Sequence, residues 1–96
     1  MPDVTVTLRS QKISVDKNPV QVSVSKGEQV HWKSTGGAFE IVFKPGSDWP
    51  DPPPARQAGG VWQTHSGPFN KPNTKLQYNV TASGFDILDP DVDIIP

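Results

Sequence analysis

The chain contains no cysteine, one methionine and one tyrosine among its 96 residues. Without thiols it can form no disulfide, no cysteine-ligated zinc site and no thiol nucleophile. It also lacks any apolar run of the roughly 18 residues that indicate a membrane-spanning helix. Nine lysine and arginine residues face ten aspartate and glutamate residues, so little net charge draws the chain to phosphate backbones or anionic bilayers. We therefore expect neither a nucleic-acid partner nor a membrane partner.

The start of the chain, Met1-Pro2-Asp3, lacks the basic and then apolar segments of a signal peptide. As written, the sequence predicts a cytoplasmic protein, and removal of a leader would make it periplasmic or secreted. A chain of this length is typical of one domain, which we place over residues 1–96.

Apolar residues recur at every second position through the first quarter of the chain. They are Val4, Val6, Leu8, Ile13, Val15, Val20, Val22 and Val24. This period is typical of strands with one buried face, and β-branched residues favour such strands. The pattern returns in residues 28–34, 39–43, 76–82 and 88–94, with no helical period competing. The sequence predicts an all-β fold, specifically an antiparallel Greek-key β-sandwich with Trp32 in its core.

The alternation stops between residues 45 and 72, where proline and glycine concentrate. Because proline cannot donate to a strand ladder, we expect a long Pro/Gly-rich loop there. A loop of this length is either functional or poorly ordered. It carries Trp49 and Trp62, which either cover the open end of the sandwich or form a recognition surface.

Three segments carry a family resemblance: residues 26–32 (Lys-Gly-Glu-Gln-Val-His-Trp), the strand from Phe39, and residues 78–82 (Tyr-Asn-Val-Thr-Ala) leading to Phe85. Over most of its length the chain resembles the cupredoxins, in particular their plastocyanin-like members. In copper-bearing members a histidine begins the second of these strands, and Phe39 stands there. The resemblance aligns the copper cysteine with Ala82 and the following histidine with or near Phe85.

A blue-copper site needs a thiolate and two imidazoles, and the aligned positions supply none of them. The resemblance therefore implies a cupredoxin-like fold without copper, electron transfer or any other cofactor. The closing stretch, residues 78–90, is also similar to small bacterial cupredoxin-like proteins that lack copper ligands and have no assigned activity.

Other metal or catalytic sites find little support in the residues. His31 lies between inward-facing neighbours and should face out of the core, whereas His65 lies in the long loop. Two imidazoles without a third partner are typical of a solvated surface, so we expect no metal site. His65 and Ser66 are sequence neighbours, but no third group orients them as a nucleophile and base. We expect no catalytic residues and no enzyme activity.

The remaining interpretation is a noncatalytic interaction or ligand-binding module. The candidate ligand-binding residues are Phe39, Trp49, Trp62 and Phe85, which a cupredoxin topology would gather at one pole. Clustered aromatics can anchor a protein segment or an apolar ligand. Phe39 and Phe85 are equally suited to filling the volume of the lost copper site.

Two alternatives stay open. One is a carbohydrate-binding module in which Trp49 or Trp62 forms a platform for a sugar ring, beside Gln57, Gln63 and Asn70. The other, less favoured by the residues, is a metal-binding protein.

Overall fold

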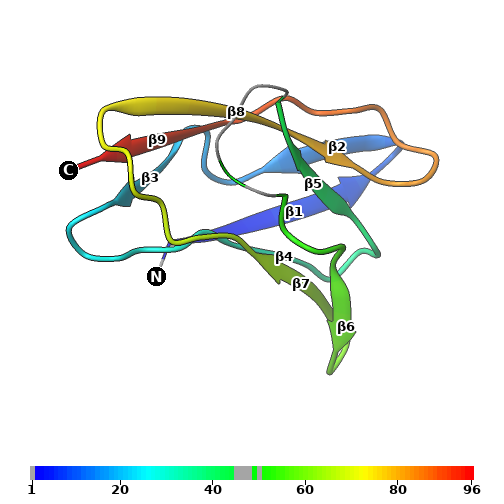
Figure 1. Cartoon of the computed structure of the whole chain (residues 1–96). Coiled ribbons are helices and arrows are strands. Elements are labelled where there is room, and N and C mark those ends of the chain that lie inside the picture. The colour runs from blue at the N-terminus through cyan, green and yellow to red at the C-terminus, as the bar shows by residue number, and fades with distance from the viewer. Residues whose placement is uncertain (1, 45–48, 50) are drawn as a thin grey trace.

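A computed structural model describes residues 2–44, 49 and 51–96, which form two β-sheets packed against each other (Figure 1). One sheet has the order β2 (Lys12–Val15), β1 (Asp3–Arg9), β4 (His31–Ser34), β7 (Val61–His65) and β6 (Arg56–Ala58). The other has the order β3 (Val20–Ser23), β9 (Asp91–Ile95), β8 (Thr74–Thr81) and β5 (Glu40–Phe43). The described residues contain no helix, and so none that could cross a membrane. The all-β prediction is confirmed.

Both sheets are mixed rather than antiparallel. β1 pairs in parallel with β4, and β3 pairs in parallel with β9, while the other strand pairs are antiparallel. The prediction of an antiparallel sandwich is therefore wrong for these two strand pairs. Alternation determines which face of a strand is buried, but it does not determine the neighbour beside which the strand lies.

The core follows the predicted alternation. Val4 and Val6 are buried, while Thr5 between them and Thr7 after them are exposed. Trp32 of β4 is fully buried, and its Nε1 donates a hydrogen bond of 3.1 Å to the hydroxyl oxygen of Tyr78 in β8. Since β4 and β8 belong to different sheets, this contact joins the two layers through the middle of the core.

The predicted loop over residues 45–72 is wrong in its central part, because β6 and β7 lie within it. The two strands form an antiparallel hairpin joined by Gly59 and Gly60, whose φ angles are 60° and 82°. Positive φ at both positions is what a two-residue hairpin turn requires, and glycine adopts it without strain. Trp62 therefore lies in a strand. Residues 45–48 and 50 of the predicted loop lie outside the described residues.

Residues 51–55 run beside the outer edge of β5. At one end, an Asp51 carboxylate oxygen accepts a 2.8 Å hydrogen bond from the Phe43 N–H. At the other, the Ala55 N–H donates to the carbonyl oxygen of Phe39 at 3.2 Å. Between them the carbonyl oxygen of Pro53 accepts a 2.6 Å hydrogen bond from the Thr64 hydroxyl in β7. Residues 51–55 thus cover an edge of one sheet and connect it to the other.

Candidate functional site

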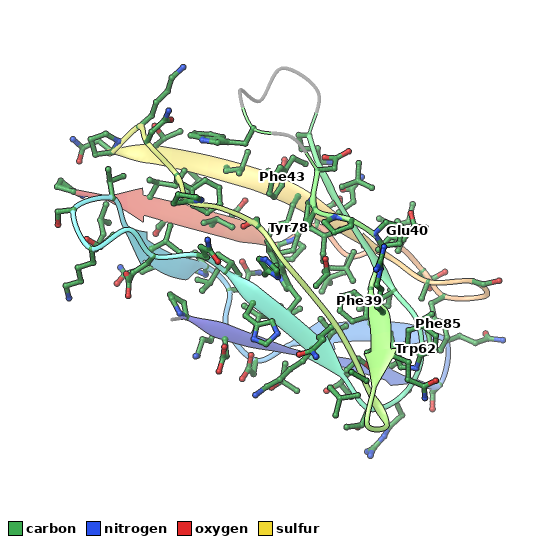
Figure 2. The ribbon with its side chains drawn as sticks, turned by 60° about the horizontal axis from the view of Figure 1, so that its bottom comes forward. Phe39, Glu40, Phe43, Trp62, Tyr78 and Phe85 are labelled. Carbon is green, nitrogen blue, oxygen red and sulfur yellow. The ribbon has the colours of Figure 1, made fainter. Side chains whose placement is uncertain are left out.

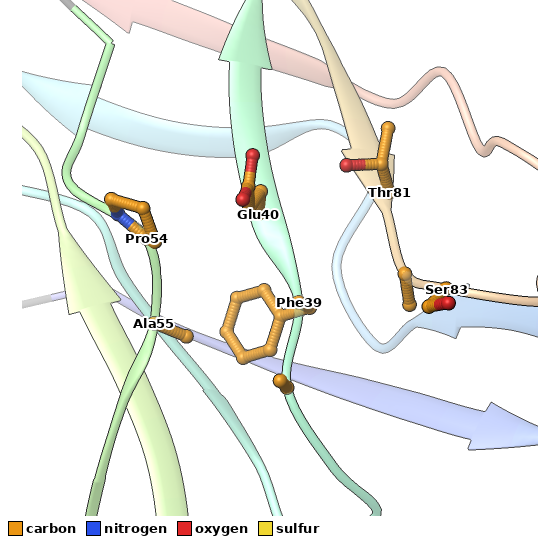
Figure 3. A pocket seen from close by; sticks show the side chains of 8 residues that line it. Phe39, Glu40, Pro54, Ala55, Thr81 and Ser83 are labelled. Atoms are coloured by element: carbon orange, nitrogen blue, oxygen red, sulfur yellow. The ribbon is translucent and has the colours of Figure 1, made fainter.

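A pocket of about 390 Å³ opens where Phe39 leads into β5 (Figure 3). Three segments meet there because Glu40 lies opposite Thr81 in the register of β5 and β8, and Ala55 is hydrogen-bonded to Phe39. We call it the Phe39 pocket. Its lining residues are Ala38, Phe39, Glu40, Pro54, Ala55, Thr81, Ala82 and Ser83.

The lining of the Phe39 pocket is apolar on one side and polar on the other. The Phe39 ring is turned toward Ala55, while Thr81 and Ser83 lie across the pocket at the end of β8 (Figure 3). The side chain of Phe39 is almost wholly enclosed, with 2% of the residue exposed. The pocket therefore owes its volume to small side chains around a buried ring, and it suits an apolar group of modest size.

Glu40 supplies the formal charge of this pocket. The residue is exposed, and no lysine or arginine in the described part of the chain forms an ion pair with it. A solvated carboxylate beside an apolar pocket complements a ligand that carries a cation next to an apolar group.

Three of the four predicted ligand-binding residues lie at the same end of the sandwich. Phe39 is part of the core, and Phe85 and Trp62 are half-buried and pack against the core (Figure 2). Of the three, only Phe39 lines the pocket. Phe85 and Trp62 lie outside the lining of this pocket and are partly buried against the core.

Trp49 packs against a different part of the core. Its ring lies edge-on to Phe69 with centroids 5.3 Å apart, and Phe69 in turn lies 6.4 Å from Phe43. Phe43 continues this aromatic series to Trp32, at a centroid distance of 6.5 Å. Trp49 thus packs against the aromatic interior.

The positions that the resemblance aligns with copper ligands converge in space. Phe39 and Ala82 line the same pocket, and the Phe85 N–H donates a 3.0 Å hydrogen bond to the carbonyl oxygen of Ala82. None of these residues can supply a thiolate or an imidazole. Among the described residues, no group of three or more His, Cys, Asp or Glu side chains is placed to hold a metal ion.

The structure changes the expected position of one histidine. His65 lies in β7, directly opposite His31 of β4, rather than in a loop. The two rings meet edge to face with centroids 6.5 Å apart. His31 is half-buried on the outer face of the sheet, as its neighbours predicted.

Sequence reasoning missed most of the Phe39 pocket, including Glu40, Pro54, Ala55 and Ser83. Small side chains carry no distinctive pattern, and their convergence depends on pairings between distant segments. The available signal was the Gly59-Gly60 pair, which is typical of a hairpin and would have placed residues 54 and 55 just before a strand.

Comparisons of the chain with protein-family models, with curated proteins and with solved structures found no match.

Proposed function

We propose that this chain is a noncatalytic binding domain with a cupredoxin-like, Greek-key fold that lacks copper. In this proposal the Phe39 pocket takes an apolar side chain from a segment of a partner protein. The observation that carries the proposal is the convergence of residues 38–40, 54–55 and 81–83 on one pocket, which includes two of the positions aligned with copper ligands.

The size and lining of the pocket support a side chain as the ligand group. Its volume of about 390 Å³ lies near the lower end of the roughly 300–1,000 Å³ typical of small-ligand sites. Ala38, Ala55 and Ala82 leave the space open, and buried apolar anchors supply much of the energy of protein interfaces. Glu40 favours a lysine or arginine beside the anchor in the partner segment.

The same lining supports a noncatalytic role. Its hydroxyl groups belong to Thr81 and Ser83, and its titratable group is the Glu40 carboxylate. No imidazole or amine lines this pocket, so its hydroxyls lack the usual base that activates a serine or threonine nucleophile.

Selection from a displayed library of random peptides tests the proposal. We expect the selected peptides to share an aromatic or large aliphatic residue next to a lysine or arginine. Ala38→Leu places extra carbon atoms in the pocket from an exposed position, so it should weaken binding at least about tenfold, or about 1.4 kcal/mol. Glu40→Gln should weaken binding of the basic peptides and reduce their salt dependence.

The matched control is Ala58→Leu, which adds the same side chain at an exposed position in β6 outside the pocket. It should leave binding unchanged. Peptides that bind Ala38→Leu as tightly as the wild type would refute the Phe39 pocket as the binding site.

The β6 and β7 hairpin supports carbohydrate binding as a second candidate. Gln57 lies directly opposite Trp62 in the hairpin register, which places an amide next to an indole. Soluble glycans that stack on the Trp62 indole should quench or shift tryptophan emission in the wild type. They should have less effect in Trp62→Phe. An absence of change with a broad glycan panel would remove this candidate.

A further inference from the structure

A second hollow, of about 440 Å³, opens beside the outer face of the five-stranded sheet. We call it the Arg56 hollow. Its polar lining comes from β4, β7 and β6 and consists of His31, Arg56, Gln63, Thr64 and His65. No aspartate or glutamate lines it, so the guanidinium of Arg56 supplies its formal charge.

The strand register brings three of these side chains together. Arg56 of β6 lies directly opposite Gln63 of β7, and His65 follows two residues later on the same face of β7. Opposite residues have Cβ atoms about 4.5–5.5 Å apart, and diagonal neighbours such as Arg56 and His65 about 7–8 Å. Their side chains are therefore within reach of one small group in the hollow.

The hydrogen bonding of the hollow leaves donors available. The Nε2 atom of His31 lies 2.9 Å from the side-chain oxygen of Gln63. Because an amide oxygen can only accept, Nε2–H donates to it, and the NH₂ group of Gln63 remains as a donor. Arg56 forms no ion pair within the described part of the chain. A guanidinium beside an amide NH₂ group suits a carboxylate, which can accept two parallel hydrogen bonds from arginine.

Asp3 is the acidic residue that contacts this lining, and its charge is engaged elsewhere. One carboxylate oxygen lies 3.4 Å from Nδ1 of His31, and the other lies 3.8 Å from Nζ of Lys33. Asp3 itself does not line the hollow. Arg56 therefore remains as a cation whose charge no neighbouring carboxylate offsets.

Pro54 connects the Arg56 hollow to the Phe39 pocket, because it lines both. Within the Phe39 pocket, Pro54 and Ala55 lie on the side opposite Thr81 and Ser83 (Figure 3). Arg56, which follows Ala55 directly, belongs to the hollow. The two cavities are thus separated by one proline, and a single bound segment can reach both.

We propose that the Arg56 hollow takes the carboxylate of an aspartate or glutamate from the same partner segment whose apolar side chain enters the Phe39 pocket. This inference rests on the proposed function, and it adds a second recognised group to the partner. An extended segment advances about 3.3 Å per residue, so we expect the acidic residue roughly two to four positions from the anchor. Opposite charges at Glu40 and Arg56 would also favour one orientation of the segment over its reverse.

Selection of a displayed random-peptide library on the intact wild-type chain and on Arg56→Gln tests the inference. We expect the wild type to enrich an aspartate or glutamate at a constant spacing from the apolar anchor. Arg56→Gln should retain the anchor and lose the acidic position. The matched control is Arg9→Gln, which removes the same charge at an exposed position of β1 outside both cavities. It should retain both features.

A synthetic peptide from the wild-type selection, and the same peptide with its acidic residue replaced by the corresponding amide, measure the contact directly. Arg56→Gln should weaken binding of the acidic peptide about three- to tenfold and leave that of the amide peptide unchanged. Equal weakening of both peptides would overturn the carboxylate contact. Circular dichroism of each variant checks that the fold is retained.

The outcomes separate this inference from the proposed function. An apolar anchor without an acidic position, or an acidic position that persists in Arg56→Gln, would overturn the inference and leave the Phe39 pocket as the binding site. Ala38→Leu should weaken binding of both peptides. Binding that Ala38→Leu leaves unchanged would overturn the proposed function, and with it the joined site.

Discussion

The buried side chain of Tyr78 makes the stability of the fold depend on pH. The residue is fully buried, and burial raises the pKa of its phenol to about 12, although the hydrogen bond from Trp32 opposes this rise. Nearby carboxylates of Asp91 and Asp16 raise the pKa further. The protein therefore keeps the neutral phenol where an unfolded chain would ionise it.

The raised pKa predicts alkaline unfolding. Tyr78 contributes stability that is fully present below pH 10, the phenol's ordinary value, and is lost as the pH rises towards about 12. A shift of about two units corresponds to about 2–3 kcal/mol. Because Tyr78 is the sole tyrosine, its phenolate absorbance can be followed directly during a pH titration. We expect phenolate to appear near pH 12 together with loss of the fold.

Tyr78→Phe is the matched variant for this prediction. It lacks the ionisation, so the stability of this variant should fall less between pH 10 and 12 than that of the wild type. Reversible ionisation near pH 10 in the folded protein would contradict the assignment of a buried phenol.

Trp32 and Trp49 should differ in their contribution to stability. Trp32 is fully buried between the sheets, whereas Trp49 is half-buried against Phe69. Trp32→Ala should lower the free energy of unfolding by roughly 3–5 kcal/mol, the usual cost of truncating a large core aromatic. Trp49→Ala should cost clearly less. Urea denaturation of both variants measures the difference, and equal large losses would place Trp49 in the core proper.

At the scale of strands, Asp51 helps to cover the outer edge of β5. Its carboxylate accepts the Phe43 N–H, and the three prolines that follow, residues 52–54, offer no N–H groups to the edge. Covering an edge strand in this way prevents it from pairing with another chain.

Asp51→Ala should therefore destabilise the protein and expose the edge. Loss of the acceptor should cost roughly 1–3 kcal/mol and speed hydrogen exchange at the Phe43 amide. Asp51→Asn keeps an acceptor oxygen at the same position and should retain most of the stability. Equal behaviour of the two variants would show that the carboxylate oxygen does not hold this edge.

The strands show where sequence reasoning succeeds and where it stops. Alternation identified Val4, Val6 and Trp32 as core residues because burial on one face of a strand repeats locally. The β6 and β7 hairpin is not predicted, because the prolines on either side of it favour one continuous loop. The parallel pairing of β1 with β4 was missed because it depends on segments more than twenty residues apart.

At the scale of the whole molecule, the Phe39 pocket and the His31–His65 pair both depend on such distant pairings. The Phe39 pocket needs β5 beside β8 and residues 54–55 beside β5. The histidine pair needs β4 beside β7. The sequence carries these side chains but not their proximity, so it predicted Phe39 without most of the pocket around it and placed His65 in a loop.

The central claim, that the Phe39 pocket is a binding site, is tested most directly by NMR of the intact labelled chain with small aromatic fragments, with and without an amino group. We expect the amide shifts to concentrate at residues 38–40, 55 and 81–83, and the amino fragments to bind more tightly because of Glu40. Ala38→Leu should abolish these shifts while Ala58→Leu preserves them. Shifts that centre on Trp49 and Phe69, or that persist in Ala38→Leu, would contradict the account.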